Sequence, residues 1–119
     1  MIVSKREEAK QFSTASGVTN SILISGERMM FLLIELKPGS VIPLHSHPHE
    51  QMGICINGKV ELQGGERTVV VESNTVWLFH SNERHGAKVV GKEGATLLEA
   101  FSPPREDYLA RVSSDPRNI

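Results

Sequence analysis

Apolar residues in this chain come in short runs that turn residues interrupt. The runs span residues 31–36, 51–56, 59–63, 68–71, 76–80, 88–90 and 95–101. Two of the interruptions, Asn57-Gly58 and Gly64-Gly65, are pairs that favour tight hairpins. Short apolar or alternating segments between regular turns are typical of an antiparallel sandwich or barrel. The pattern therefore predicts an all-β domain.

The C-terminal region breaks this pattern and has the features of a helix. Ser102 is a suitable N-cap, and the two prolines behind it suit the first helical positions. The apolar residues that follow fall on one helical face, namely Tyr108, Leu109 and Val112. We expect a helix over residues 103–112 and frayed residues from Ser113 to Ile119.

The segment 51–56 predicts a strand with two unlike faces. Side chains two apart share a face, so Gln51, Gly53 and Cys55 point the same way. This set is small and polar, and we expect it to face the interior and leave room for a cavity. The other face carries three apolar side chains, Met52, Ile54 and Ile56. The second sheet lies across the interior and cannot cover that face, so the cover is a partner subunit or a terminal segment, and we expect a homodimer.

Length and composition restrict the class of protein. The 119 residues suffice for one domain with its own core, so we treat 1–119 as a single domain. A formal net charge of −1, without a long block of like charge, argues against nucleic acid as a partner. The single cysteine, Cys55, excludes an intramolecular disulfide and fits a reducing compartment. The first residues lack the apolar core of a signal peptide, and no apolar run reaches membrane-spanning length, so we expect a cytoplasmic protein without a membrane partner.

The densest group of candidate functional residues is His45-Ser46-His47-Pro48-His49-Glu50-Gln51. His45 and His47 share a face if this segment is extended, and two adjacent imidazoles begin a chelate for a transition metal. Gln51 and His85 can supply the third and fourth ligands if the chain folds back on itself, as the turns indicate. Such a donor set accepts zinc, nickel, manganese, iron or copper. The alternatives are that the histidines are ordinary polar residues at a strand end and that the Gln51 amide bonds nearby backbone.

The same residues give the chain a resemblance to the cupins. The first cupin signature holds a glycine, a His-x-His pair, a glutamate and a second glycine; the matching residues here are Gly39, His45, His47, Gln51 and Gly58. His85 matches the end of the second signature, whose glycine and proline are replaced by Asn74 and His80. Over about residues 30–101, the resemblance implies a double-stranded β-helix (jelly roll) with a metal site.

A narrower resemblance is to small cupins of pectin degradation, which ring-open or ketonise the unsaturated uronates released by lyases. Their pattern has a glutamine ligand, an acid two residues before a phenylalanine, and an arginine four residues after it. Gln51, Phe101 and Arg105 match, and Glu99 stands where that family has aspartate. The resemblance implies a small anionic sugar-like substrate, with Glu99 as general acid or base and Arg105 as a two-pronged partner of the substrate carboxylate. Neutral histidine and glutamine ligands leave the ion its full charge, which favours such an anion.

Other interpretations stay open at this point. The same site with an open position could serve an iron- or manganese-dependent dioxygenase, or the barrel could bind a sugar or a metal without turnover. Arg105 could pair with a carboxylate at the rim instead of with substrate. His49 fits a solvated turn or a second layer around the metal. We expect the aromatic residues of the strands in the core, and the sequence leaves open which one faces the cavity: Phe31, Trp77 or Phe79.

Overall fold

The computed structural model describes residues 1–114, and β-strands make up most of them. In chain order the elements are the 3₁₀ turn η1 (Arg6–Glu8), β1 (Lys10–Ala15), β2 (Val18–Ser25), β3 (Met30–Leu36), β4 (Val41–His45), β5 (Glu50–Asn57), β6 (Lys59–Gly64), β7 (Arg67–Glu72), β8 (Val76–Phe79), β9 (His85–Val89), β10 (Ala95–Ser102) and α1 (Glu106–Ser114). Among these residues, no helix is long and apolar enough to cross a bilayer.

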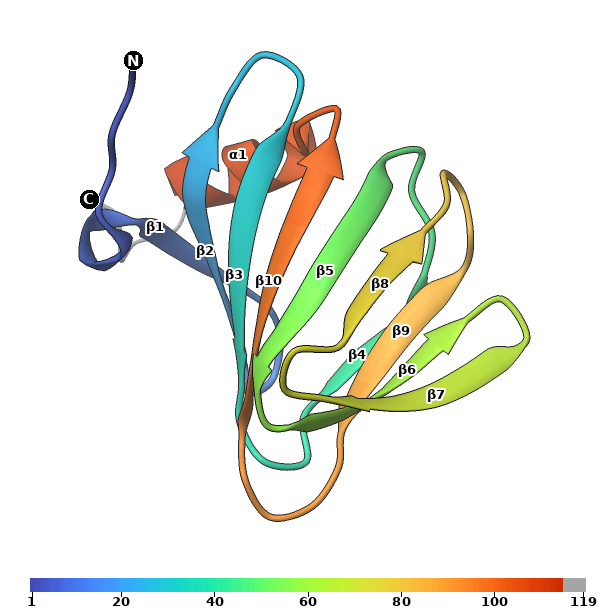
Figure 1. Ribbon diagram of the computed structural model, residues 1–119. Coiled ribbons are helices and arrows are strands. Elements are labelled where there is room, and N and C mark those ends of the chain that lie inside the picture. The colour runs from blue at the N-terminus through green and yellow to red at the C-terminus, as the bar shows by residue number, and fades with distance from the viewer. Residues whose placement is uncertain (115–119) are drawn as a thin grey trace.

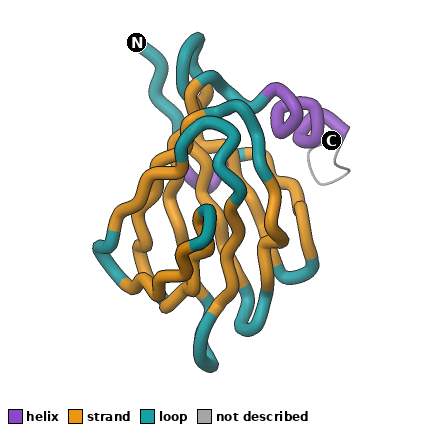
Figure 2. The backbone as a smooth tube through the Cα atoms, turned by 90° about the vertical axis from the view of Figure 1, so that its right-hand side faces the viewer, coloured by secondary structure: helices purple, strands orange, loops and turns teal. Residues whose placement is uncertain are grey.

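The strands form two antiparallel sheets that lie against each other (Figure 1). The larger sheet has the order β1-β2-β3-β10-β5-β8, and the smaller one has the order β4-β9-β6-β7. Turned by 90°, the strands run side by side in one block, with α1 and the N-terminus near the same end (Figure 2). The expected all-β fold with a short C-terminal helix is therefore confirmed.

Alternation along β10 shows how the sequence builds the interior. Leu97, Glu99 and Phe101 are buried, whereas the side chains between them are half-buried on the opposite face. Apolar residues of both sheets close around this row: Leu32, Ile34, Cys55, Val60, Leu62 and Phe79. The strand alternation that buries Leu97 and Phe101 therefore also places the polar side chain of Glu99 in an apolar interior.

The turns divide into one confirmed hairpin and one that the sequence misassigns. Gly64-Gly65 connects β6 and β7, which pair as predicted. Asn57-Gly58 also makes a tight turn, but β5 and β6 belong to different sheets and do not pair, so the predicted hairpin there is wrong. Gly58 has φ +87°, and an added Cβ would lie 2.5 Å from the Gly94 carbonyl oxygen. The glycine therefore lets the chain cross between the sheets close to the β9–β10 turn.

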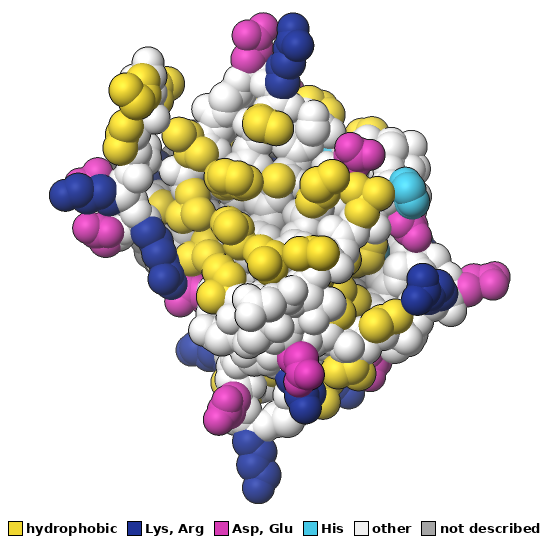
Figure 3. Space-filling view, in the orientation of Figure 1, with side chains coloured by type: hydrophobic (Ala, Val, Ile, Leu, Met, Phe, Trp, Pro, Cys, Tyr) yellow, Lys and Arg dark blue, Asp and Glu magenta, His cyan; other side chains and the backbone are white. Residues whose placement is uncertain are grey.

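The two faces of β5 are those that the alternation predicts. Gln51, Gly53 and Cys55 are buried, and Met52 and Ile56 are exposed. Phe31, expected in the core, lies on the same outer face and is 47% exposed. Figure 3 shows apolar side chains gathered across this face of the larger sheet.

Both ends of the fold differ from the sequence-based expectation. The first two strands, β1 and β2, lie outside the predicted barrel of residues 30–101 and extend the larger sheet. The helix begins at Glu106, later than predicted. Ser102 does not cap it, because this residue still belongs to β10, and its hydroxyl donates to the Arg28 carbonyl oxygen (2.7 Å). The helix continues to Ser114, so the predicted fraying at residues 113 and 114 is wrong. The remaining residues, 115–119, lie outside the described part of the chain.

Candidate metal centre

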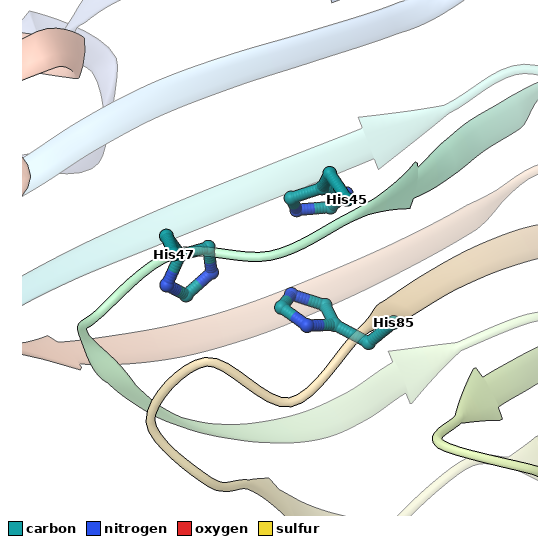
Figure 4. A group of neighbouring side chains, drawn as sticks. All are labelled: His45, His47 and His85. Atoms are coloured by element: carbon teal, nitrogen blue, oxygen red, sulfur yellow. The ribbon is translucent and has the colours of Figure 1, made fainter.

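Three histidines from separate segments meet inside one end of the barrel (Figure 4). His45 ends β4 and lies opposite His85, the first residue of β9. His47 follows in the loop before β5, so the turn of this loop, not a continuous strand, brings it to its partner His45. One ligand nitrogen from each ring lies within 4.8 Å of the others. This spacing allows all three rings to bind one ion.

Backbone carbonyl groups fix the orientation of two of these rings. Nδ1 of His45 donates to the Pro43 oxygen (2.7 Å), and Nδ1 of His85 donates to the Glu83 oxygen (2.8 Å). In each ring the hydrogen on Nδ1 leaves the lone pair on Nε2. The His85 Nε2 atom is buried and has no hydrogen-bond partner among residues 1–114. Metal-bound histidines typically have this outer partner, so the arrangement fits a metal.

Electrostatics keep the buried rings in the form that binds metals. Burial, and then the positive charge of Arg105, lower the pKa of His47 to about 4. Burial also lowers the pKa of His85. Both imidazoles are therefore neutral at pH 7, and neutral imidazole is the metal-binding form.

Gln51 and Glu99 extend the site into a chain of hydrogen bonds. His47 Nε2 lies 2.9 Å from Gln51 Oε1 and donates to it, and the Gln51 amide nitrogen donates to Glu99 Oε2. The amide thus bonds two side chains rather than backbone, and its oxygen faces the histidines. Burial raises the pKa of Glu99 to about 8, against the opposing effect of Arg105. Glu99 is therefore mostly a neutral acid at pH 7.

Arg105, just before α1, brings a buried positive charge to the same region. Its Nε and Nη2 atoms donate to the two carboxylate oxygens of Asp107 at 3.0 and 2.8 Å, and this pairing lowers the pKa of Asp107. Its guanidinium carbon lies 3.7 Å from the Tyr108 ring centre and 5.1 Å from that of Phe101. The third nitrogen, Nη1, is buried and finds no acceptor within the described chain. A buried guanidinium with a free N–H group is suited to bind an anion.

The cavity next to His45, His85 and Glu99 is small. The cavity measures about 30 Å³. Polar and aromatic residues of its wall include His45, Gln51, His85, Glu99, Phe101 and Tyr108. The room expected beside Gly53 is filled, because a Cβ there would lie 2.4 Å from Cε2 of Trp77. Such a cavity holds about one water molecule.

Three aromatic side chains lie next to the site in positions that the sequence did not predict. Phe79 stacks on His85 with ring centres 4.3 Å apart, so one of the expected core residues supports a candidate ligand. His49 is half-buried with its ring centre 5.2 Å from that of His47, next to the candidate ligands and not in a solvated turn. Tyr108 lines the cavity from α1. Only the apolar face assigned to the helix hinted at this role for Tyr108.

Comparison with other proteins places the chain in a family. Residues 32–101 match the Cupin domain family. The chain is 27% identical over 96 residues to the pectin degradation protein KdgF of Dickeya dadantii (strain 3937), covering 78% of this chain and 84% of that protein. It is 31% identical over 67 residues to H2HPP isomerase of Bacillus subtilis, covering 56% of this chain but only 28% of that protein.

Solved structures show the same fold at low sequence identity. An RmlC-like cupin from Shewanella frigidimarina NCIMB 400 aligns with a TM-score of 0.83 at 22% identity, covering 91% of this chain and 96% of that one. KdgF from Halomonas sp. also aligns with a TM-score of 0.83, at 19% identity, covering 91% and 98%. Because the family match covers more than half of its residues, this chain belongs to the cupin domain family.

Proposed function

We propose that this cupin is a metal-dependent enzyme that ring-opens or ketonises 4,5-unsaturated uronates or a related sugar acid. The observation that carries the proposal is the buried Nη1 of Arg105, an unused donor beside a cluster of three histidines arranged to bind a cation. A cationic centre next to a free guanidinium N–H favours a small carboxylate ligand. The likeness to KdgF, named for pectin degradation, and to an isomerase supports this reaction class.

The histidines and Gln51 would hold the ion. His45, His47 and His85 would each offer a neutral nitrogen, which for His47 is Nδ1, a buried atom without a partner among the described residues. Gln51 would offer its amide oxygen, which here accepts from His47 Nε2, while its amide nitrogen donates to Glu99. Bound there, a divalent ion such as zinc, nickel, manganese or iron supplies a positive charge that polarises a substrate oxygen. The choice among these ions depends on availability more than on this donor set.

Glu99 would move the proton. Ketonisation of an enol adds a proton at carbon and removes one from the enol oxygen. The Glu99 carboxyl group, with its pKa raised by burial to about 8, has a proton to donate at pH 7 and can regain one from the enol. Its position next to Gln51 keeps this group adjacent to the candidate metal ligands.

Arg105 would orient the substrate. Asp107 holds the guanidinium through two nitrogens, so Nη1 keeps a fixed direction and remains available to donate to a ligand. A substrate carboxylate bound there would place the reacting carbon near Glu99, within an environment that Phe101 and Tyr108 shield from water.

The test combines metal analysis with a turnover assay. Wild-type protein and a His45→Ala/His47→Ala variant are loaded with each metal and then dialysed, and retained metal is measured. Each is incubated with 4,5-unsaturated galacturonate while absorbance of the conjugated double bond is followed. We expect near-stoichiometric metal and metal-dependent loss of absorbance in the wild type only. Metal binding without turnover, or turnover that consumes oxygen, would contradict the proposed reaction, and the second result would point to a dioxygenase.

A further inference from the structure

The cavity beside the histidines is too small for a sugar acid. It measures about 30 Å³, whereas sites for small molecules typically measure about 300–1,000 Å³. A uronate ring therefore needs additional space that connects with the candidate metal centre. A larger space lies on the side of the barrel where the edge strands of the two sheets do not pair.

β7 and β8 are the last strands of their sheets, and neither pairs with the other. Between them lies a cleft of about 320 Å³. Leu62, Val69 and Val71 form one wall, and Trp77 and Phe79 form the other. In Figure 1 the free edges of β7 and β8 can be followed on the same side of the molecule.

Exposure along β7 shows that this cleft opens the interior to solvent. Val69 pairs with the inward-facing Leu62 and shares its face, yet Val69 is 42% exposed and Leu62 only 7%. An inward-facing valine with that exposure marks a place where the barrel wall is missing. An apolar face left open in this way can bind the apolar surface of a ligand.

The cleft also reaches the candidate metal centre. Leu62 and Phe79 line both the cleft and the small cavity. The Phe79 ring lies nearly parallel to the His85 ring, with 15° between the planes. Phe79 and Leu62 therefore lie between the two spaces, and the Phe79 ring also contacts a candidate ligand.

The chemistry of the cleft suits a sugar ring. The Trp77 indole lies over Gly53, and its Nε1 atom is buried with no partner in the described residues. Arg67 and Glu83 lie at the polar end of the cleft. An indole face packs against the C–H groups of a ring, and the charged groups can bond its hydroxyls.

We infer that the cleft between β7 and β8 is where the sugar-acid substrate enters and seats its ring, with the reacting end directed past Phe79 toward His85. This inference rests on the proposed function, because the class of ligand comes from the candidate metal centre. It assigns to Trp77 the cavity-facing aromatic role that the sequence left open.

Two substitutions on neighbouring residues test the inference. Val69→Phe places a large ring in the cleft, and Val70→Phe places the same ring on the outer face, where Val70 is 53% exposed. Both positions are exposed strand sites at which an aromatic residue is well tolerated. We expect Val69→Phe to raise KM for 4,5-unsaturated galacturonate by about tenfold or more, and Val70→Phe to leave it unchanged, with equal metal content in both.

Trp77 gives a second readout because it is the only tryptophan in the chain. Saturated galacturonate lacks the reactive double bond, so it serves as a probe that binds without turnover. We expect it to change Trp77 fluorescence in wild type and Val70→Phe, and much more weakly in Val69→Phe. Equal KM values in the two variants, or competitive inhibition by galacturonate without any change in Trp77 emission, would overturn the cleft while leaving the proposed function intact. A metal-loaded wild type that neither binds nor converts these compounds would instead overturn the proposed function and the inference with it.

Discussion

At the residue scale, Arg105 differs from an ordinary surface arginine because its guanidinium is buried and held in place. Its planar group is held by Asp107 and two rings, so exchange for lysine keeps the charge but loses the fixed direction of Nη1. We expect Arg105→Lys to lower kcat/KM for the unsaturated uronate by about 10- to 100-fold, mostly through KM. Steady-state kinetics measure this, with Arg28→Lys on the exposed β2–β3 turn as the control. Unchanged kinetics would leave Arg105 as a structural ion pair.

The role of Glu99 can also be tested by a single substitution. Glutamine at this position keeps an oxygen that accepts from the Gln51 amide but has no proton to exchange. We therefore expect Glu99→Gln to retain metal and to lose turnover by roughly 100-fold or more. Metal analysis beside the absorbance assay measures both, and Glu50→Gln on the exposed side of β5 is the matched control. Full activity in Glu99→Gln would refute a role in proton transfer.

At the scale of elements, the sequence predicts where a strand lies when one of its faces is apolar. It does not predict which strand pairs with which. Alternation placed the strands over 31–36, 51–56 and 95–101 close to β3, β5 and β10. It could not show that β5 and β6 separate into different sheets, because a tight Asn-Gly turn looks the same in a hairpin and in a crossing. The sequence did not predict β1 and β2, whose polar residues obscure the strand pattern. Tertiary contacts hold these strands: β1 pairs with β2, β2 pairs with β3, and Tyr108 of α1 packs on Phe12 of β1.

The contact between β5 and β8 gives a prediction at this scale. The Trp77 indole occupies the space where a side chain of residue 53 would lie, and a methyl group on Gly53 would be 2.4 Å from the ring. We expect Gly53→Ala to lower the free energy of unfolding by about 1–3 kcal/mol and to shift Trp77 emission, because the ring must move. Urea unfolding followed by fluorescence measures both effects. Gly26→Ala is the control, since its nearest contact is 3.6 Å away; equal losses in the two variants would show that Trp77 adapts without cost.

The residues of the candidate metal centre could be predicted from the sequence, whereas the shape of the cavity beside them could not. His45, His47, Gln51, Glu99 and Arg105 all come close to His85, because strand alternation and turns already constrain them. The shape of the cavity depends on rotamers of large side chains from distant strands, such as Trp77 over Gly53 and Phe79 on His85. No local pattern contains that information, so a roomy cavity was expected where a small one lies.

At the scale of the whole molecule, the outer face of the larger sheet carries exposed apolar side chains over most of its width, although Leu33 at its β3 end is only 3% exposed. Two cross-strand rows run over β3, β10, β5 and β8. Phe31, Ala100, Met52 and Leu78 form the first, and Leu33, Leu98, Ile54 and Val76 form the second. Neighbouring strands lie about 4.8 Å apart, so this apolar patch is on the order of 15–20 Å wide. The helix α1 lies behind this sheet, on the side away from the patch (Figure 1).

A second copy of the chain is therefore the partner that we predict for this face. Two such patches related by a two-fold axis would bury each other, as in the self-complementary interfaces of symmetric dimers. Met52 and Val76, 55% and 69% exposed, can be changed to lysine without disturbing the core. We expect a dimer for the wild type in light scattering coupled to size exclusion, and a folded monomer for Met52→Lys/Val76→Lys, because two copies would place like charges in an apolar contact. Val70→Lys, on an exposed apolar position of the smaller sheet, should stay dimeric; a monomeric wild type at micromolar concentration, or a dimer that survives both lysines, would show that this face does not join two copies.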